Sequence, residues 1–554
     1  MHSLFSLERF TMSTWREFER DFARLLFHLN FSDVRLIGGS NEKGADILAV
    51  KDKNRWAFQC KFTNSGNVNK KGVKQLVEAK KYYGVDKIGL VTSGIPGAAL
   101  KKTLAKQSRF GFDISLFDLK RILRLAKNAP NFSPRKKTLR DYQDETKIGL
   151  YHNLLNTGKG FAIMATGLGK TVVISQLVSD LFEYKKLKNN RVLVLAHTND
   201  LVDQLLKDFW CQLPKTVLTN RLGNGEKPFQ YNGITFSTIQ TASLLKNKLP
   251  YFDLVVVDEA HRIGSESYLN TIDALGPQMI CGVTATPWRG DNFNIRTVIG
   301  DPVSNVGIAE GLRLGYLAEV DYRMLADDLN WNMVQDLSQF DYSLKQLNRK
   351  LILPKRDKEA AKIIYDTFKK DDRKSCIVFS PTIVHAKSFA GTLRLLGLRA
   401  ISISSKLNKR ERNRLLSNFK AGLYDVVVAV DIFNEGVDVP DVDLIAFLRV
   451  THSRRLFVQQ LGRGLRISST KDKVIVLDFV SDIRRIAAVL KLDKTACGGS
   501  IEKLGLGKSL VKFIGKGSNK LSKEWMLDQA DFLNRDNDSS LELPEFDYPG
   551  PLKV

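Results

Sequence analysis

Short apolar runs alternate with amphipathic helical patterns over most of the chain. From residue 138 onward a first series of runs reads "FAIMAT", "RVLVLAH", "ITFSTIQ", "LVVVDEAH" and "GVTATP", and a second reads "SCIVFS", "RAISIS", "DVVVAVD", "LIAFLR" and "VIVLDF". Continuous apolar runs of this length are typical of parallel strands that are covered on both faces. The pattern therefore predicts two doubly wound parallel-sheet domains, at 138–315 and 316–490. The less regular stretch 316–358 is compatible with an adapting helix, a partial insertion or the first strand of the second domain.

The N-terminal residues 1–125 predict a smaller α/β domain. A helical pattern over 14–29 precedes a predicted hairpin over 44–62, and a polar helical pattern and the strand "KIGLVTSG" follow. Residues 126–137 have the Asn, Pro, Ser and Lys content of a linker. Residues 491–554 are first rich in Gly and Lys and then acidic, so we expect a short, partly disordered appendage.

The composition indicates which kind of partner and which cellular compartment to expect. The 554 residues include 85 Lys and Arg against 60 Asp and Glu, a formal net charge of +25. That excess favours nucleic acid as a partner, although a basic, well-solvated surface would have the same composition. The five cysteines include no CxxC pair, so neither a disulfide framework nor a zinc site is predicted, and the apolar runs around Cys281 and Cys376 indicate buried thiols. Because the N-terminus lacks a signal-peptide pattern and no apolar run reaches membrane-spanning length, we expect a cytoplasmic protein that does not enter a membrane.

The segment "MATGLGKT", 164–171, follows a predicted strand and precedes a helical pattern. Glycines let backbone N–H groups approach phosphates, a lysine reaches the outer phosphates, and a threonine hydroxyl holds Mg²⁺. The alternative is an accidental glycine-rich turn, which the strand before it and the helix after it disfavour. The ATP-binding residues that this loop predicts are Thr166, Gly167, Leu168, Gly169, Lys170 and Thr171.

Two further segments supply charged groups suited to phosphate chemistry. In "LVVVDEAH", Asp258 ends a buried strand and can hold Mg²⁺, while Glu259 can orient the attacking water. In "QQLGRGLR", the three-residue spacing puts Gln460, Arg463 and Arg466 on one helical face, where arginines can neutralise developing phosphate charge. The alternatives are a simple helix N-cap for the acidic pair and a solvated basic helix for the arginines.

The predicted hairpin over 44–62 carries polar residues among apolar ones. If its turn centres on Asp52 and Lys53, Asp46 lies opposite Gln59 with Cβ atoms roughly 5 Å apart. Two oxygens at that spacing can share a hard cation such as Mg²⁺. Lys61 lies one step further on the same face, where it can position a water and stabilise negative charge on a phosphate.

The helical pattern over 14–29 offers a third acidic group. Its apolar stripe includes Phe18, Phe22, Leu25, Leu26 and Leu29, and Glu19 lies almost in line with that stripe. A carboxylate on a core-facing stripe is unusual, so Glu19 is predicted to belong to the site around Asp46. Glu17 lies further from the stripe and is expected to be solvated.

The motifs over 138–490 resemble, in content and order, those of superfamily 2 DEAH-box helicase motors, most closely the type I and III restriction motors and DNA-repair helicases. The resemblance implies that Arg140 and Gln143 of "LRDYQ" contact adenine and that Gly436 and Asp438 of "FNEGVDVPDVD" lie near the nucleotide. It identifies "VLAHTNDLVDQ" as the helicase motif Ia. It also identifies "GVTATP", with Thr284 and Thr286, as the motif that links hydrolysis to movement. It also implies two RecA-like lobes, with ATP and Mg²⁺ as cofactors.

The N-terminal constellation resembles the Mrr-like branch of the PD-(D/E)xK nucleases. The matching segments are "FER" with Glu19, "GADI" with Asp46, and "QCK" with Gln59 and Lys61. The resemblance implies a small restriction-endonuclease-like α/β domain. Gln59 stands where most of the superfamily has an acid, which lowers the negative charge available to a metal. A satisfied polar strand end is the alternative interpretation of these residues.

The sequence thus predicts an ATP-dependent DNA translocase or helicase with an N-terminal Mg²⁺-dependent endonuclease, with a role in restriction of foreign DNA. Because no "NPPY" methyltransferase motif occurs in the chain, protection of self DNA requires a specificity or methyltransferase partner subunit, or recognition of modified DNA. Two alternatives stay open: a repair-type helicase whose N-terminal domain only binds DNA, and an ATP-gated nucleic-acid sensor or scaffold. RNA is also compatible with the motor, while the nuclease resemblance favours duplex DNA, with single-strand tracking possible.

Overall fold

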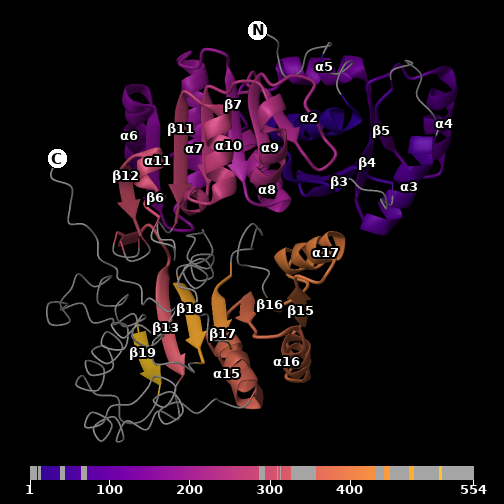
Figure 1. Cartoon of the computed structure of the whole chain (residues 1–554). Helices are drawn as coiled ribbons and strands as arrows, with labels where there is room; N and C mark the ends of the chain where they lie inside the picture. Colours follow the sequence, from indigo (N-terminus) through magenta and orange to yellow (C-terminus); the bar gives the residue numbers. More distant parts are fainter. Residues whose placement is uncertain are drawn as a thin grey trace, which may run out of the picture. The chain divides into compact units, whose positions relative to one another are not determined.

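The computed structural model describes Arg9, 14–37, 44–63, 71–285, 293–307, 310–311, 314–325, 357–430, 442–448, 473–479 and 511–514. The chain divides into two compact units. The first comprises Met1–Ala162, Thr171–Val283 and Phe293–Ser304, and the second comprises Ile163–Lys170, Thr284–Asn292 and Asn305–Val554. Figure 1 shows the order of the elements.

The N-terminal domain is a five-stranded sheet covered by helices on both faces. Its strands, in spatial and chain order, are β1 (Ser32–Leu36), β2 (Ile47–Lys51), β3 (Asn54–Lys61), β4 (Lys87–Thr92) and β5 (Ile114–Phe117). The pairs β1–β2 and β2–β3 are antiparallel, and β3–β4 and β4–β5 are parallel. The helices of this domain are α2 (Trp15–His28), α3 (Lys71–Tyr83), α4 (Ala98–Arg109) and α5 (Leu119–Asn128).

The alternation of side chains along β3 assigns a helix to each face of this sheet. Phe58 packs edge-on against Phe22 of α2 and against Phe117 of β5. Ala57 points to the other face, into a core that includes Val73 and Leu76 of α3. The strand is therefore buried on both sides, which explains why its apolar run is continuous.

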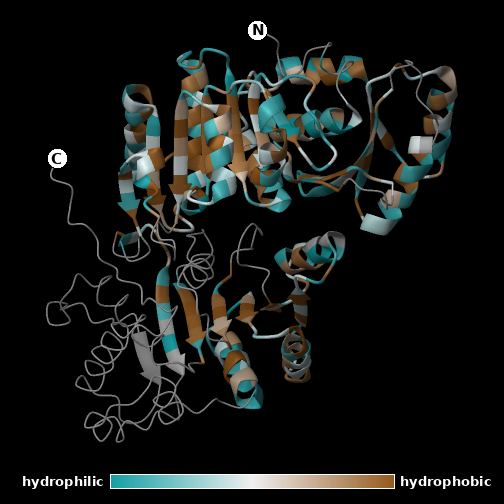
Figure 2. Cartoon of the chain, viewed as in Figure 1, coloured by the Kyte–Doolittle hydropathy of each residue, from teal (hydrophilic) through white to brown (hydrophobic). Residues whose placement is uncertain are grey.

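The first motor lobe has a seven-stranded sheet in the order β12-β6-β11-β10-β7-β9-β8. These strands are β6 (Lys159–Met164), β7 (Arg191–Ala196), β8 (Thr219–Leu222), β9 (Gly233–Thr238), β10 (Leu254–Asp258), β11 (Met279–Thr284) and β12 (Pro302–Val306). The accompanying helices are α6 (Asp141–Thr157), α7 (Lys170–Glu183), α8 (Asn199–Gln212), α9 (Ile239–Leu245), η1 (Lys246–Lys248), η2 (Ala260–Arg262), α10 (Glu266–Leu275) and α11 (Arg296–Ile299). The central strands are apolar along most of their length (Figure 2), as expected of parallel strands covered by helices.

The second motor lobe has a sheet in the order β15-β16-β14-β17-β18-β13-β19, with parallel pairing throughout. Its strands are β13 (Glu319–Leu325), β14 (Cys376–Phe379), β15 (Ala400–Ser404), β16 (Val426–Val430), β17 (Leu444–Phe447), β18 (Lys473–Asp478) and β19 (Val511–Ile514). Its described helices are α15 (Asp357–Lys370), α16 (Ile383–Leu395) and α17 (Lys409–Lys420). The predicted α/β class with doubly wound parallel sheets is confirmed.

Two stretches that the sequence pattern left ambiguous supply strands. The stretch 316–358 contains β13, a strand of the second lobe, and its last two residues begin α15. Within the segment expected to be an appendage, β19 pairs with β13 in parallel and lies at one edge of that sheet. Across the described parts of the chain, no helix has the length and apolar character needed to cross a membrane.

Helix α2 is buried on two opposite faces. Its apolar stripe packs on the β1–β5 sheet, and the other face meets residues of the first motor lobe within the same compact unit. Every residue from Glu17 to His28 is consequently buried. We call the second face the docking face; its members are Glu17, Arg20, Asp21, Arg24, Phe27 and His28.

The docking face is held mainly by charged and polar contacts. Arg24 donates from Nη1 to the carbonyl oxygen of Val217 at 2.6 Å and from Nη2 to that of Pro214 at 2.8 Å. Arg20 pairs with Glu226 of the same lobe. Phe27 packs edge-on against Trp210, with ring centroids 5.6 Å apart. The nuclease-like domain and the first lobe therefore share one interface in which arginines satisfy backbone carbonyl groups.

The expected solvation of Glu17 is wrong. Glu17 is 2% exposed, its Oε2 accepts from the backbone N–H of Thr14, and its Oε1 accepts from that of Phe229 at 3.3 Å. Its position is explained by the docking face, because the motor lobe covers the side of α2 that would otherwise meet water.

The segment 126–137 is anchored rather than extended between the domains. The ammonium of Lys215 donates to the carbonyl oxygens of Ala126 and Ala129, at 2.9 and 2.6 Å. The hydroxyl of Ser133 donates to the carbonyl oxygen of Phe27 at 3.1 Å. These bonds attach the connecting segment to α2 on one side and to the first motor lobe on the other.

Candidate functional sites

The β2–β3 hairpin has the predicted register. Ile47 pairs with Phe58, so the residues that precede and follow them, Asp46 and Gln59, lie opposite each other. The turn residues Asp52 and Lys53 have φ angles of 49° and 64°. Two consecutive residues with positive φ match the right-handed twist of hairpin strands and fix the pairing register.

Asp46 and Gln59 meet as a hydrogen-bonded pair. Nε2 of Gln59 donates to Oδ2 of Asp46 at 2.5 Å, and the same oxygen accepts from the backbone N–H of Cys60 at 2.5 Å. Both side chains are buried, at 3% and 5% exposure. Charge-assisted hydrogen bonds of this kind compensate the burial of a carboxylate. The predicted geometry thus brings the two side chains together, with the amide nitrogen of Gln59 toward Asp46.

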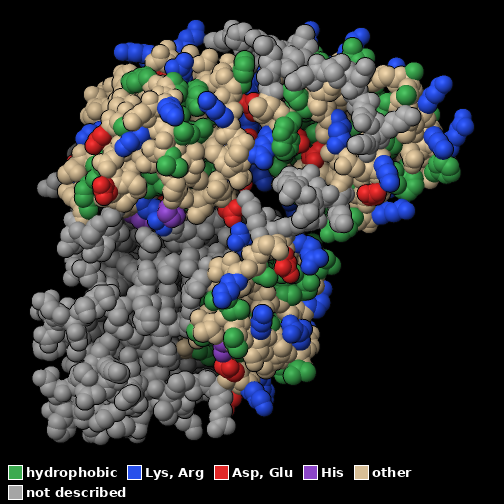
Figure 3. All heavy atoms as spheres, turned by 45° about the vertical axis from the view of Figure 1, so that its right-hand side comes forward, with side chains coloured by type: hydrophobic (Ala, Val, Ile, Leu, Met, Phe, Trp, Pro, Cys, Tyr) green, Lys and Arg blue, Asp and Glu red, His purple; other side chains and the backbone are tan. Residues whose placement is uncertain are grey.

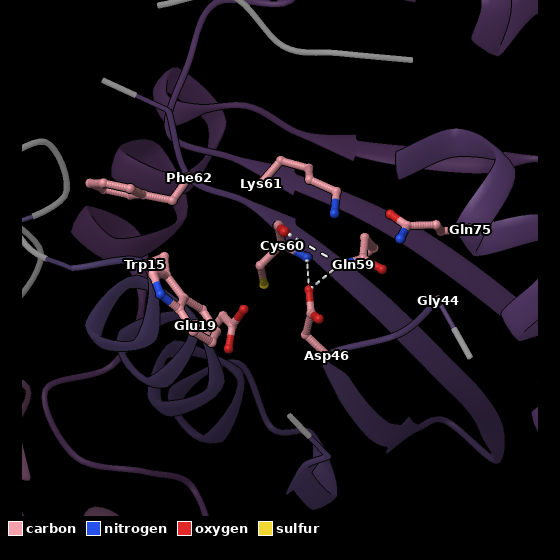
Figure 4. Close-up of a pocket in the computed structure, with 9 residues that line it drawn as sticks. All are labelled: Trp15, Glu19, Gly44, Asp46, Gln59, Cys60, Lys61, Phe62 and Gln75. Carbon is pink, nitrogen blue, oxygen red and sulfur yellow. Dashed lines mark hydrogen bonds between the residues drawn. The ribbon is translucent and has the colours of Figure 1, made fainter. Parts of the chain in front are cut away.

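A cavity of about 310 Å³ opens beside this pair. It is lined by all four residues that the sequence assigned to the site and by five others. The lining residues are Trp15, Glu19, Gly44, Asp46, Gln59, Cys60, Lys61, Phe62 and Gln75. Figure 4 shows Glu19 reaching the cavity from α2 and Asp46, Gln59 and Lys61 from the hairpin. Glu19 is 9% exposed, in agreement with its predicted position near the core-facing stripe.

The donor set of this cavity fits Mg²⁺ in charge type. Mg²⁺ binds oxygen ligands, usually one or two carboxylates together with water and substrate phosphate. Glu19 and Asp46 supply two carboxylates here. Within the described ranges, no group of three or more His, Cys, Asp and Glu could hold a metal, so phosphate oxygens and water would complete the shell. Gln59 would join the shell only with its amide turned, because its nitrogen now faces Asp46.

Sequence reasoning missed five lining residues: Trp15, Gly44, Cys60, Phe62 and Gln75. Trp15 is the first residue of α2, and its side chain is 50% exposed. Gly44 has a φ of +79° and precedes the strand of Asp46. A glycine two residues before a candidate ligand was a usable signal for a close backbone approach. Gln75 lies on the polar α3 pattern, which gave no indication of its place.

The phosphate-loop segment has the conformation that its glycines allow. It connects β6 to α7, and Gly167 and Gly169 have φ angles of 94° and 85°. Nζ of Lys170 donates to the carbonyl oxygen of Met164 at 3.3 Å. Met164 stands where the phosphate-loop pattern usually has its first glycine. It is fully buried at the end of β6 and is therefore a core residue. Thr171 follows in the first turn of α7, and Leu168 is buried.

Asp258 and Glu259 stand at the end of β10 as predicted. Asp258 is the last residue of the strand. Glu259 has a φ of 54°, a left-handed conformation that is uncommon outside glycine and is concentrated at functional sites. Its Oε2 lies 3.3 Å from Nδ1 of His261, which is 1% exposed. Thr284 is fully buried at the end of the neighbouring strand β11.

Arg140 and Gln143 lie at the start of α6. Oε1 of Gln143 accepts from the backbone N–H of Arg140 at 3.0 Å, and Nε2 donates to the hydroxyl of Tyr142 at 3.3 Å. Gln143 therefore serves as a helix cap, and its contact with adenine stays a prediction. Five other predicted residues lie outside the described residues: Gly436, Asp438, Gln460, Arg463 and Arg466. The same holds for Thr286.

Three family models match the chain in the predicted order. Residues 10–126 match the model described as "Restriction endonuclease", of Mrr type. Residues 136–289 match "Type III restriction enzyme, res subunit", and residues 359–468 match "Helicase conserved C-terminal domain". The chain thus joins an Mrr-type restriction endonuclease domain to both domains of a superfamily 2 helicase motor, and the predicted resemblance is confirmed.

One curated relative matches a large part of the chain. The "Putative ATP-dependent helicase IRC3" of Saccharomyces cerevisiae is 26% identical over 358 residues, which are 62% of this chain and 51% of that protein. The chain therefore spans about half the length of this curated relative.

Two solved structures share the fold. "The fragment structure of a putative HsdR subunit of a type I restriction enzyme from Vibrio vulnificus YJ016" has a TM-score of 0.50 at 19% identity and covers 88% of this chain and 92% of its own. The "ATP-dependent Type ISP restriction-modification enzyme LlaBIII bound to DNA" has a TM-score of 0.50 at 17% identity, covering 96% of this chain and 42% of its own.

Proposed function

We propose that this protein is an ATP-driven DNA translocase or helicase that cleaves DNA with its N-terminal domain in the restriction of foreign DNA, acting in the cytoplasm. The observation that carries the proposal is the cavity in which Glu19, Asp46, Gln59 and Lys61 meet. This cavity belongs to a domain of the restriction-endonuclease family and shares a compact unit with the first motor lobe. The helicase family implies ATP and Mg²⁺ as cofactors, and the nuclease family implies Mg²⁺.

The residues of the nuclease site have separate tasks in this proposal. Glu19 and Asp46 would hold Mg²⁺, and the bound ion would supply Lewis-acid stabilisation of the charge that develops on phosphate. Cys60 holds Asp46 in place through its backbone N–H. Lys61, from the same strand, donates to the phosphate or to the attacking water. Trp15, which lines the cavity, is 50% exposed, so a DNA strand could approach the cavity at this residue.

The motor residues would act on ATP. The loop over 165–169 would offer backbone N–H groups to the phosphates, Lys170 would neutralise their outer charge, and Thr171 and Asp258 would hold Mg²⁺. Glu259 orients the attacking water. Arg463 and Arg466 are proposed to neutralise charge from the second lobe, whose closing and opening would drive movement along DNA.

Duplex DNA is the proposed substrate. The net charge of +25 supports a polyanionic partner, and Figure 3 shows Lys and Arg side chains spread over the displayed face of both units. DNA affinity should fall steeply with salt, because each neutralised phosphate releases counterions. A specificity or methyltransferase subunit is proposed as a partner, since restriction requires that self DNA be spared.

The test uses the full chain with supercoiled plasmid that carries or lacks methylated bases, with and without ATP and Mg²⁺. Nicking that requires Mg²⁺, disappears in Asp46→Ala and is strongly reduced in Lys61→Ala is the expected result. Asp113→Ala, an exposed change in the same domain, serves as the matched control and should leave nicking intact. Nicking that survives in both site variants would show that the assigned nuclease site is wrong.

A second candidate is a repair-type helicase whose N-terminal domain binds DNA without cutting it. The observation that favours it is the amide of Gln59, which turns its nitrogen, not its oxygen, toward Asp46 and donates to Oδ2 of that carboxylate. DNA-stimulated ATP hydrolysis without nicking under any of the plasmid conditions would select this candidate.

A further inference from the structure

Two polar groups in the nuclease cavity lack a partner among the residues that the structure describes. Oε1 of Gln75 is buried and accepts no hydrogen bond. Nζ of Lys61 makes no hydrogen bond or ion pair with any described residue. A buried acceptor without a donor costs about 1–3 kcal/mol, so such a group in a polar cavity calls for an explanation.

Helix α3 holds Gln75 firmly in this position. A Cβ on Gly44 would come within 2.0 Å of the carbonyl oxygen of Gln75, so the chain that leads to Asp46 lies directly on this turn of the helix. Three residues earlier, a Cβ on Gly72 would lie 3.1 Å from Cε of Lys61. Residues three apart share a helix face, so α3 presents the glycine to the lysine stem and the amide to the cavity.

The two groups are chemical complements. An ammonium can only donate and an amide oxygen can only accept, and one water molecule can accept from the first and donate to the second. Figure 4 shows both side chains pointing into the cavity, with the Lys61 ammonium on the side of Gln75. The 310 Å³ cavity has room for such a water, and a rotation of the Gln75 amide would bring Oε1, which is buried in this conformation, to it.

We propose that Gln75 and Lys61 together hold the water that attacks the phosphodiester. This inference rests on the proposed nuclease function and adds Gln75 to its site. The water oxygen forms a new bond to phosphorus while one ester P–O bond breaks. The leaving oxygen takes up one proton, and the attacking water releases one to solvent, so no oxidant or reductant is needed. Gln75 orients the water by accepting its hydrogen bond, since a neutral amide does not take its proton.

The test compares four full-length proteins in single-turnover nicking of supercoiled plasmid: wild type, Gln75→Leu, Lys61→Met and the double variant. Gln75→Leu keeps the side-chain size and removes the acceptor. We expect it to lower the cleavage rate by about 100-fold, the usual cost of a misplaced reactant, with unchanged DNA affinity and ATP hydrolysis. Gln75→Glu, which restores an acceptor oxygen, should recover most of the rate.

The double variant separates a shared water from two independent roles. If both side chains hold one water, the double variant cleaves no more slowly than Lys61→Met alone, because the first loss already removes the water. If the rate loss in the double variant equals the product of the two single-variant losses, the proposal is wrong. Cleavage by Gln75→Leu within about twofold of wild type, a difference too small for a lost catalytic contact, would also overturn it.

The control is Gln240→Leu, the same chemical change at an exposed position of α9. The outcomes for Gln75 are distinct from those for the nuclease assignment itself. Suppose that wild type nicks plasmid, that Asp46→Ala does not, and that Gln75→Leu nicks as fast as wild type. In that case the proposed role of Gln75 is wrong and the nuclease assignment stands. If wild type does not nick, the nuclease assignment and the role of Gln75 fall together.

Discussion

Arg24 of the nuclease helix α2 donates from Nη1 to the carbonyl oxygen of Val217 in the first motor lobe, at 2.6 Å. Its side chain is completely buried, and burial lowers the pKa of its guanidinium to about 9. A charge in such a place is tolerated because it satisfies backbone carbonyl groups that would otherwise be buried without a donor.

Replacement of Arg24 should therefore weaken the interface between the nuclease domain and the first motor lobe. Arg24→Met leaves the carbonyl oxygen of Val217 without its donor and removes one of the two donors to the carbonyl oxygen of Pro214, and we expect a loss of about 2 kcal/mol in the free energy of unfolding. The loss stays modest because the variant also removes the cost of burying the charge. Urea unfolding of the full chain measures it, with the exposed Arg109→Met as control. Identical unfolding midpoints for Arg24→Met and wild type would contradict the importance of this contact.

The same interface should be sensitive to acid through His28. Burial and the nearby positive Arg24 lower the pKa of His28 from 6.5 to about 3. The folded protein thus keeps a neutral imidazole where the unfolded chain takes up a proton. The stability contribution is complete above pH 6.5 and declines by roughly 1.4 kcal/mol per pH unit as the pH falls toward 3.

His28→Gln removes this titration and should flatten the decline of stability between pH 6.5 and 4.5. Thermal unfolding of wild type and variant over that range makes the comparison. His152→Gln, at an exposed position of α6, should follow wild type. A parallel decline in His28→Gln and wild type would show that other groups cause the acid sensitivity.

Two glycines with the same φ allow a matched test of the nuclease loop. Gly44 and Gly111 both have a φ of +79°, so an alanine at either place carries similar backbone strain, about 1–2 kcal/mol. A Cβ at Gly111 meets nothing within 4 Å, whereas one at Gly44 meets the backbone of Gln75 at 2.0 Å. We expect Gly111→Ala to lower stability slightly and keep nicking. Gly44→Ala should lose more stability and abolish nicking, as measured by thermal unfolding and the plasmid assay. Equal behaviour of the two variants would mean that the close approach to Gln75 has no consequence.

The ATP site should respond differently to its two charged groups. Lys170→Ala should abolish ATP hydrolysis, because the outer phosphate charge is no longer neutralised. Glu259→Gln should keep ATP binding and lower turnover by at least about 100-fold, since the attacking water loses its acceptor. Phosphate release and nucleotide binding, each with and without DNA, give the readouts. Hydrolysis that persists in Lys170→Ala would overturn the phosphate-loop assignment.

The hairpin could be predicted in detail because its geometry is local. A two-residue turn at Asp52 and Lys53 fixes the register, and the register brings Asp46 to Gln59. Helix periodicity placed Glu19 beside them for the same reason. The parallel strands of both lobes were likewise predictable, since strands buried on both faces have continuous apolar sequences.

The docking face of α2 could not be predicted from the sequence. Its charged residues have the spacing of a solvated helix face, and nothing in that spacing records that another domain covers it. Glu17 was misplaced for this reason. Gln75 escaped notice because its role depends on the approach of Gly44 from a distant part of the chain.

Helix α2 is buried against both the N-terminal sheet and the first motor lobe. The segment 126–137 is hydrogen-bonded to α2 and to the first motor lobe. A proteolytic cut in that segment would therefore sever the chain without separating the pieces. The same sharing limits how this protein can change by recombination. An exchanged nuclease would have to bring a helix whose charged side matches Pro214, Val217 and Glu226 of the recipient motor. The nuclease and the first lobe are thus expected to be inherited as a single piece.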